Sequence, residues 1–330
     1  MTPTLRIAIV GAGAIGCTLA ARLVGSGQPV KLLARGDTLA TLKRDGIRLS
    51  DLQGEHHVRV TASDNAHELG EQDLIFICTK APALPAVLAQ IPPMVGPHTV
   101  VVPVVNGVPW WYFHGEGGRF AGQPIKALDV DGQLARALDL SHVIGCVVFI
   151  TAQCPQPCVV ESRNPHLMIV GEPDNSLSPR LEQLRDVIER AGIEARSTDR
   201  IRDSLWTKII ANLTSNPLSV VTGATLEQLY GLPELRELVS STLHETLLTA
   251  AAHGARVSID PHTFLELGAG MGAVRTSMLQ DFDKGRPLEL AAIGDAVLEL
   301  AEHMAVPMPV TRNIIALARF RGAHPTPQGA

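Results

Sequence analysis

Hydrophobic positions follow two different patterns along the chain. In the first part, short apolar runs rich in β-branched residues alternate with segments of helical spacing, which is typical of strand–helix–strand units. Strands are expected at residues 5–10, 29–33, 73–78, 99–105, 142–151, 159–162, 167–170 and 194–197, and helices at 15–26 and 179–191. We expect the strands between residues 142 and 170 to close the sheet in antiparallel or mixed pairing.

From about residue 198 onward, apolar residues recur at helical intervals, first at Ile201, Leu205 and Ile209 and then through the rest of the chain. Strand-like alternation is nearly absent there. The sequence therefore predicts a Rossmann-type, doubly wound α/β domain over residues 1–198 and an all-helical domain over 199–330. The active site would lie in the cleft between them. The Pro/Gly-rich tail at 324–330 is expected to fray.

The composition limits the classes of function. The 330-residue chain is 45% hydrophobic and 18% charged, which suits two globular domains. A net charge of −5 argues against a nucleic-acid-binding protein, which usually has a basic face. Five cysteines, an odd number without C-x-x-C spacing, favour reduced thiols over a disulfide framework or a zinc site. We therefore expect a cytoplasmic protein without a metal.

Residues 7–21 carry no charge and resemble a signal peptide or a membrane span at first sight. The stretch is shorter than the roughly 20 apolar residues that a span needs. Arg22 ends it, and three glycines interrupt it. A strand followed by a helix fits better, and we expect no contact with a membrane.

The motif GAGAIG directly follows the first expected strand and opens the first expected helix. In that context the first glycine permits a tight turn, the second lets the backbone approach a pyrophosphate, and the third allows close packing. The helix N-terminus adds unpaired N–H groups and a positive dipole end. The alternative is a glycine-rich turn without a ligand. The predicted cofactor-binding residues are Gly11, Ala12, Gly13, Ala14, Ile15 and Gly16.

The second expected strand ends without the Asp or Glu that holds the ribose 2′-hydroxyl in NAD-binding units. Its sequence runs VKLLARG at residues 30–36. Arg35 instead offers a planar, charged fork that suits a 2′-phosphate. We therefore expect NADP rather than NAD, the alternative being a solvated surface arginine.

Lys80 and Asn106 follow the next two expected strands. The carboxyl ends of parallel strands face the crevice in which doubly wound sheets bind ligands. The Asn106 amide can donate and accept, which suits contacts to both a nicotinamide and a substrate carbonyl. Either residue could instead end its strand or form a turn.

In the helical domain, Lys208, Asn212 and Asn216 are spaced i, i+4, i+8, which places them on one helix face. Asparagine is a mediocre helix former, so two on this stripe suggest a polar ligand face rather than a solvated stripe. Pro217 is expected to end or kink the helix directly after them. Further along, Ser277 can donate to a carboxylate. Glu289 opens an apolar helix, where an ordinary first-turn carboxylate is the alternative.

In this order the motifs resemble the ketopantoate reductase family (2-dehydropantoate 2-reductases) over nearly the whole chain. The central segment is the most diagnostic, because its lysine and both asparagines keep the family's spacing. The interval between Ser277 and Glu289 also fits. The matching segments are GAGAIG at 11–16, CTK at 78–80, NG at 106–107, LWTKIIANLTSNPLS at 205–219, and TSMLQD and KGRPLEL within 276–290.

The resemblance implies NADPH-dependent reduction of 2-dehydropantoate, a small 2-keto acid, to pantoate in pantothenate and coenzyme A biosynthesis. It implies that Lys208 is the general acid, which is reasonable because an ammonium stabilises the negative charge that hydride addition builds on oxygen. The substrate contacts that it implies are Asn106, Asn212, Asn216 and Ser277. The further cofactor contacts that it implies are Lys80, Asn106, Thr151 and Glu289.

One segment departs from the family pattern. The family commonly has a Gly-x-Gly type turn after its asparagine, whereas this chain reads NGVPWWYFH at residues 106–114. These aromatic residues form either a hydrophobic plug between the domains or a reshaped substrate mouth. A reshaped mouth would admit a different 2-keto acid.

Two other classes of protein stay open. A non-catalytic NADPH sensor would bind a partner through its helical domain, although it would not need to retain Lys208 as a proton donor. A flavin enzyme would share the glycine turn and no other feature. The long apolar helices allow packing within the domain or across a homodimer interface. Closure of the domains over both ligands is expected, because excluding water protects hydride transfer.

Overall fold

The structure, a computed structural model, describes residues 4–324. The chain divides into two compact units. The first comprises Met1–Val105, Trp111–Gln123 and Gly132–Ile201, and the second comprises Asn106–Trp110, Pro124–Asp131 and Arg202–Ala330. Two short segments from the first half of the chain therefore belong with the helices of the second half. Residues 325–330 of the expected frayed tail lie outside the described residues.

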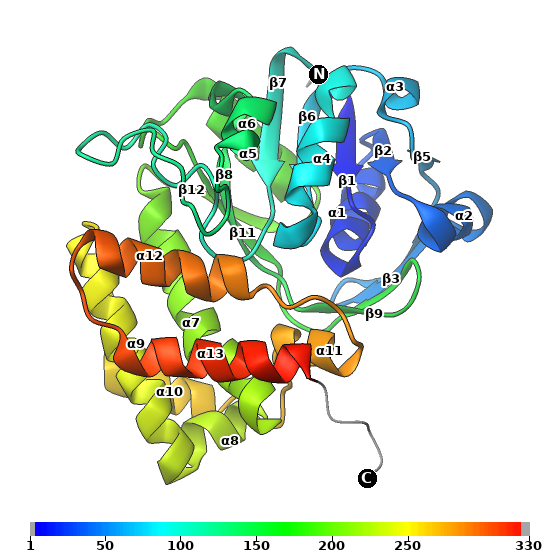
Figure 1. Cartoon of the computed structure of the whole chain (residues 1–330). Coiled ribbons are helices and arrows are strands. Elements are labelled where there is room, and N and C mark those ends of the chain that lie inside the picture. The colour runs from blue at the N-terminus through cyan, green and yellow to red at the C-terminus, as the bar shows by residue number, and fades with distance from the viewer. Residues whose placement is uncertain (1–3, 325–330) are drawn as a thin grey trace. The chain divides into compact units, whose positions relative to one another are not determined.

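The first unit is built on a five-stranded parallel sheet in the order β5-β2-β1-β6-β7, with β1 in the middle (Figure 1). Every residue of β1 is buried, as expected for a parallel strand covered on both faces. The strands are β1 (Ile7–Val10), β2 (Val30–Leu33), β5 (Thr61–Ser63), β6 (Gln72–Ile77) and β7 (Val95–Pro103). The helices α1 (Ala14–Gly25), α2 (Gly36–Asp45), α3 (Ala66–Leu69) and α4 (Leu84–Gln90) connect them. The predicted doubly wound sheet is confirmed.

Helix α1 contacts two sheets, which explains the charge-free stretch near the N-terminus. It packs against β1 and β2 and against all four strands of a second sheet. That sheet, in the order β4-β3-β10-β9, contains β3 (Ile47–Asp51), β4 (Gly54–Val58), β9 (Ala152–Gln156) and β10 (Val159–Ser162). Arg22, at the end of the stretch, is buried in an ion pair of 2.5 Å with Asp51. Among the described residues, no helix is long and apolar enough to cross a membrane.

The strands between residues 142 and 170 pair in antiparallel and mixed fashion, as expected, but the prediction that they close the parallel sheet is wrong. β10 pairs with β3 and β9, while β8 (Gly145–Phe149) and β11 (Leu167–Gly171) form a third sheet with β12 (Glu194–Ser197). Helix α6 (Pro179–Arg190) packs against β11 and β12 of that sheet. An isolated β-bridge joins Val101 of β7 to Val143, which lies just before β8. Strand partners this distant in sequence are selected by tertiary packing, which the spacing of apolar residues does not record.

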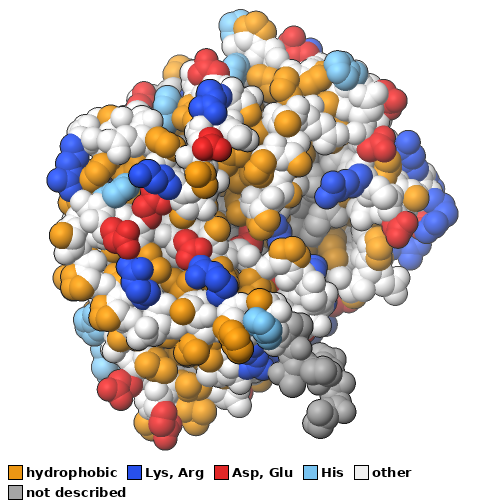
Figure 2. Space-filling view, viewed as in Figure 1, with side chains coloured by type: hydrophobic (Ala, Val, Ile, Leu, Met, Phe, Trp, Pro, Cys, Tyr) orange, Lys and Arg blue, Asp and Glu red, His pale blue; other side chains and the backbone are white. Residues whose placement is uncertain are grey.

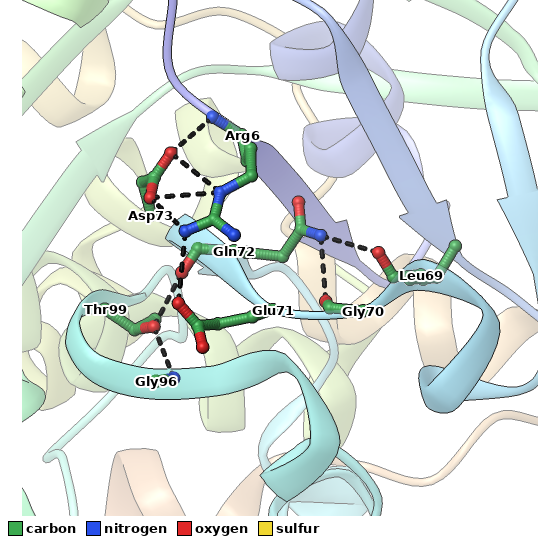
Figure 3. Close-up of polar contacts among 8 residues, drawn as sticks. All are labelled: Arg6, Leu69, Gly70, Glu71, Gln72, Asp73, Gly96 and Thr99. Carbon is green, nitrogen blue, oxygen red and sulfur yellow. Dashed lines mark hydrogen bonds and ion pairs between the residues drawn. The ribbon is translucent and has the colours of Figure 1, made fainter.

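A hydrogen-bonded network holds the amino ends of β1, β6 and β7 (Figure 3). The Arg6 guanidinium lies 2.6 Å from the Asp73 carboxylate. The Thr99 hydroxyl donates to the Gln72 carbonyl at 2.6 Å, and the Gln72 amide donates to two further backbone carbonyls. The glycine turn follows the opposite, carboxyl end of β1. This network therefore stabilises the sheet and is separate from the candidate site.

The second unit is helical, as predicted, and no strand occurs between residues 202 and 324. A π-helical turn, η4 (Ala291–Asp295), directly precedes one of its helices. The helices are α7 (Ile201–Thr222), α8 (Leu226–Gly231), α9 (Pro233–Ala252), α10 (Pro261–Ala269), α11 (Ser277–Asp283), α12 (Ala296–His303) and α13 (Pro309–Ala323).

Pro217 does not end its helix. α7 continues through it to Thr222, although proline has no N–H to donate to the carbonyl four residues before it. The next turn is buried, with Leu218 at 3% and Val220 at 0% exposure. Burial of this turn offsets the lost hydrogen bond, because tertiary packing contributes most of a helix's stability.

Candidate functional site

The three glycines of the turn have different surroundings. Gly11 has a φ of +100°, and a Cβ there would lie 2.7 Å from Cγ2 of Thr79. A Cβ at Gly16 would lie 2.0 Å from the carbonyl oxygen of Gly11. Gly13 is exposed, and a Cβ there would meet nothing within 4 Å. Packing therefore requires glycine at Gly11 and Gly16, whereas Gly13 leaves open space at the start of α1.

The start of α1 has no side-chain cap. Its N-cap residue is Gly13, and no acidic residue occurs in its first turn. The first N–H groups of a helix lack intrahelical acceptors, so this end offers donors and a positive dipole end to an anion. Hydrogen bonds tie the turn to its neighbours, from Gly11 N–H to the Leu33 carbonyl at 3.0 Å and from Cys78 N–H to the Val10 carbonyl at 2.8 Å. The carboxyl ends of β1, β2 and β6 thus meet at one edge, as a dinucleotide site requires.

Arg35 lies at this edge, directly before α2. It is exposed, and within the described residues its guanidinium has no hydrogen bond or ion pair. The guanidinium is therefore available to a phosphate group. Asp37, in the first turn of α2, is the nearest carboxylate in sequence.

Lys80 and Thr151 are the other expected cofactor contacts in the first unit. Lys80 is exposed and precedes η1 (Ala81–Ala83), just beyond the end of β6. Thr151 is exposed and lies between β8 and β9, beyond the last strand residue Phe149 instead of within the strand as expected. Its carbonyl accepts a hydrogen bond of 2.8 Å from Ser162. The backbone at Thr151 is therefore held by β10.

In the second unit, α7 carries Lys208, Asn212 and Asn216. Lys208 and Asn212 are half-buried, and Asn216 is only 3% exposed. This burial argues against a solvated polar stripe. Among the described residues, the Asn216 side-chain nitrogen, Nδ2, has no hydrogen-bond partner. A buried donor without a partner costs about 1–3 kcal/mol, so this amide calls for a polar ligand or a water molecule.

A relay of hydroxyl groups connects α7 with the start of α11. The Ser219 hydroxyl donates to the Asn216 carbonyl at 2.7 Å and lies 2.6 Å from the Thr276 hydroxyl. Because the Ser219 proton is already donated, Thr276 is the donor in the second bond. Thr276 also caps α11 by accepting the Leu279 N–H at 3.2 Å. Ser277, which is exposed, is thereby held near Asn216.

Ser219 and Thr276 were not among the residues predicted for the site. Their positions in the sequence are the only signal of their role. Ser219 follows Asn216 by three residues, and Thr276 directly precedes Ser277. Both are nearly or fully buried. Their hydrogen bonds join the backbone of α7 at Asn216 to the start of α11.

Replacement of Ser219 by alanine is expected to leave the Thr276 hydroxyl without its acceptor and to lower the free energy of unfolding by about 1–3 kcal/mol. The start of α11 would then be held less firmly. We expect a raised KM for the keto acid with an unchanged Kd for NADPH, measured by steady-state kinetics and fluorescence titration. Ser141→Ala, on the surface of the first unit, is the control. An unchanged KM would contradict the orienting role.

Asn106 belongs to the second unit, with the residues that the sequence predicts to bind substrate. It is half-buried. Glu289 is 6% exposed and lies two residues before η4. Its backbone carbonyl accepts the N–H of Ile293, a residue of η4, at 3.0 Å. The second unit therefore contains Lys208, Asn106, Asn212, Asn216, Ser277 and Glu289, and the first contains the glycine turn, Arg35, Lys80 and Thr151.

The aromatic segment after Asn106 is fully buried. Trp111 belongs to the first unit, where its ring atoms occupy the space in which a Cβ of Gly145 would lie, at 2.6 Å. Tyr112 and Phe113 form an edge-to-face pair with ring centroids 5.1 Å apart. Trp110 belongs to the second unit, and its indole N–H has no partner among the described residues. Trp111 thus fills a core, as a hydrophobic plug would.

Two substitutions in the glycine turn are expected to separate packing from ligand contact. Gly16→Ala forces a Cβ against the Gly11 backbone and should lower the melting temperature by several degrees, because the strain of overpacking is about 1–3 kcal/mol. Gly13→Ala meets open space and should leave the melting temperature nearly unchanged while raising the Kd for NADPH. Thermal unfolding and fluorescence titration measure both effects. Equal Kd values for Gly13→Ala and the unaltered protein would contradict a phosphate at this turn.

On the face shown in Figure 2, acidic and basic side chains are interspersed over most of the surface. This agrees with the low net charge of the chain. No group of three or more His, Cys, Asp or Glu side chains suited to a metal occurs among the described residues. The five cysteines are free thiols.

Two family models match consecutive parts of the chain. "Ketopantoate reductase PanE/ApbA" matches residues 7–175, and "Ketopantoate reductase PanE/ApbA C terminal" matches residues 200–322. A 2-dehydropantoate 2-reductase of Mesorhizobium japonicum is 36% identical over 96% of this chain and 97% of its own length. That of Archaeoglobus fulgidus is 26% identical over 95% of this chain and 97% of its own.

Solved structures show the same similarity. A candidate ketopantoate reductase from Ralstonia solanacearum MolK2 superposes with a TM-score of 0.93, at 37% identity, over 98% of this chain and 99% of that one. A D-mandelate dehydrogenase in complex with NADH and anilino(oxo)acetate superposes with a TM-score of 0.82 over 96% of this chain and 98% of that one. At 20% identity, the second similarity concerns the fold alone.

Proposed function

Because the chain belongs to the ketopantoate reductase family and is a nicotinamide-dependent oxidoreductase, we propose that it reduces 2-dehydropantoate to pantoate with NADPH. The buried Asn216 amide carries this proposal, since its unpartnered N–H lies on the helix that also holds Lys208. A polar substrate fits such a donor. Relatives named 2-dehydropantoate 2-reductase that match along nearly their whole length support the choice of substrate.

The glycine turn and Arg35 fit the proposed cofactor. The open space at Gly13 and the uncapped start of α1 suit a pyrophosphate, and the unpaired Arg35 guanidinium suits a 2′-phosphate. NADPH supplies a hydride when it is bound. Lys80, Thr151 and Glu289 are proposed as further cofactor contacts.

Lys208 is proposed to donate a proton to the keto oxygen of the substrate. Its ammonium stabilises the negative charge that develops on that oxygen, and its place in a half-buried part of α7 strengthens this interaction relative to water. Asn212, Asn216 and Ser277 are proposed to hold the hydroxyl and carboxylate groups of the substrate. Asn106 is proposed to contact both substrate and cofactor.

Isotope transfer tests the reaction type directly. The protein is incubated with ketopantoate and NADPH carrying deuterium at C4, using each of the two stereospecifically labelled forms, and the product is analysed by NMR. We expect one form to give pantoate with deuterium at C2. Pantoate without deuterium from either form, or no pantoate, would overturn the proposal.

A bulkier 2-keto acid is the second candidate, and the Trp110 indole favours it. This side chain is buried in the second unit, and its N–H lacks a partner among the described residues. It is a donor that the family's usual Gly-x-Gly turn would not supply. Phenylglyoxylate therefore belongs beside ketopantoate in any substrate comparison.

A further inference from the structure

We propose that Gly107 and the backbone carbonyl of Ala292 position Asn106. Their contact joins the loop that carries Asn106 to the π-helical turn η4, which follows Glu289 in the chain. The proposal rests on the proposed function for what Asn106 and Glu289 bind. It adds Gly107 and Ala292 as residues that act through Asn106 and not through a ligand contact of their own. Asn106, Gly107, Glu289 and Ala292 all belong to the second unit.

Gly107 is held in close contact with η4. Its φ is +86°, a conformation that side chains other than glycine rarely adopt. A Cβ at this position would lie 2.4 Å from the carbonyl oxygen and 2.9 Å from the Cβ of Ala292. Both the backbone conformation and the space therefore require glycine. The residue directly before it, Asn106, has little freedom to shift without breaking this contact.

A hydrogen bond secures the same contact. The Val108 N–H donates to the Ala292 carbonyl at 2.9 Å. This carbonyl is available because the π-helical turn alters the pairing, and the Ala296 N–H bonds to the Ala291 carbonyl five residues before it. In an α-helix, Ala296 would have bonded to Ala292 instead. The π-helical turn thus supplies an acceptor for the loop that carries Asn106.

A second contact of the same kind lies further along this helical segment. The Glu299 carboxylate on α12 accepts the backbone N–H groups of Lys126 and Ala127 at 2.8 and 2.7 Å. Residues 106–110 and 124–131 are both joined to the second unit, although they come from the first half of the sequence. Asn106 is therefore anchored to the unit that contains Lys208 and Glu289. A shift of η4 would move Asn106 and Glu289 together.

Gly107→Ala tests the proposal, with Gly254→Ala as the matched control. Gly254 has a φ of +74° in the same unit, and a Cβ there would meet nothing within 4 Å, so the control introduces backbone strain without the clash. We expect Gly107→Ala to lower kcat for ketopantoate by about 100-fold, because a displacement of about 1 Å costs that much. The KM should change far less. Gly254→Ala should keep the kcat of the unaltered protein.

A double-mutant cycle distinguishes positioning from general damage. Asn106→Ala is expected to lower kcat strongly in the unaltered protein and only slightly in the Gly107→Ala background, because Asn106 is already displaced there. Additive losses would overturn the proposal. An equal fall in kcat for Gly254→Ala would overturn it as well, since strain alone would then explain the effect.

Hydrogen exchange gives a readout that does not depend on turnover or on the folding of a variant. In the unaltered protein the Val108 amide is expected to exchange slowly, as a hydrogen-bonded group does. Exchange at the rate of a free loop amide would overturn the proposal. If no 2-keto acid is reduced, the proposed function fails. The double-mutant cycle of Asn106→Ala and Gly107→Ala is then carried out with the Kd for NADPH as its readout in place of kcat. Coupling in that cycle supports the positioning role, and additivity contradicts it.

Discussion

Lys208→Ala is expected to lower kcat by about 10²–10⁴-fold, the usual contribution of a general acid. The side chain is half-buried on α7, one helical turn from Asn212 and two from Asn216. Removing the ammonium would remove the proposed proton source for the negative charge that develops on the keto oxygen. The proposed NADPH contacts are the glycine turn and Arg35, so the Kd for NADPH should stay within about twofold of its original value.

Two variants make this experiment specific. Lys208→Arg keeps the positive charge but does not release a proton near neutral pH, so it should recover little of kcat. Lys43→Ala, on the exposed side of α2, should leave kcat unchanged. Stopped-flow absorbance at the NADPH band measures the chemical step, and fluorescence titration measures binding. Equal losses of turnover and NADPH affinity in Lys208→Ala would contradict its role as the proton donor.

Arg35→Ala is expected to raise the Kd for NADPH by about 10- to 150-fold, because a hydrogen bond to a charged group contributes about 1.5–3 kcal/mol. The Kd for NADH should change little, since NADH lacks the 2′-phosphate. Arg35 is exposed directly before α2, and its guanidinium has no hydrogen bond or ion pair within residues 4–324, which is the structural basis of this difference. The preference for NADPH over NADH should therefore fall by the same factor.

One control and one further variant on α2 accompany Arg35→Ala. Arg44→Ala removes an exposed arginine that is paired with Asp45, and it should leave both Kd values unchanged. Asp37→Asn tests whether the nearby carboxylate contributes to binding of either cofactor. Parallel losses of NADPH and NADH affinity in Arg35→Ala would mean that Arg35 does not recognise the 2′-phosphate.

The two-part architecture could be predicted from the sequence because its physical cause is local. Strands of a parallel sheet are buried on both faces and appear as short apolar runs, as at β1 and β6, while the helices of the second unit repeat apolar residues every three or four positions. The second sheet could not be predicted in this way. Its strands β3 and β10 pair across more than a hundred residues, and nothing in either strand specifies the other.

The prediction that Pro217 ends its helix fails for a related reason, whereas a kink there stays a prediction. Its local effect is to weaken a helix, yet the buried turn after it keeps α7 intact to Thr222. The amount of burial that a residue gains from distant elements is not visible in its own segment.

The candidate site was only partly visible in the sequence. Spacing placed Lys208, Asn212 and Asn216 on one helix, because that relation depends on helical geometry alone. The assignment of Asn106 to the helical unit depends on a backbone contact with Ala292, nearly two hundred residues away. Supporting residues such as Ser219 and Thr276 act through hydrogen bonds between α7 and α11, and no pattern within one segment indicates them.

The most direct test of the account is the oxidation of NADPH by the purified protein with a panel of 2-keto acids, with NADH measured in parallel. We expect the highest kcat/KM for ketopantoate with NADPH and a much lower value with NADH. Preferred turnover of a bulkier acid such as phenylglyoxylate would keep the chemistry and change the substrate. No oxidation of NADPH with any 2-keto acid, in a protein that binds NADPH tightly, would contradict the account and favour a sensor.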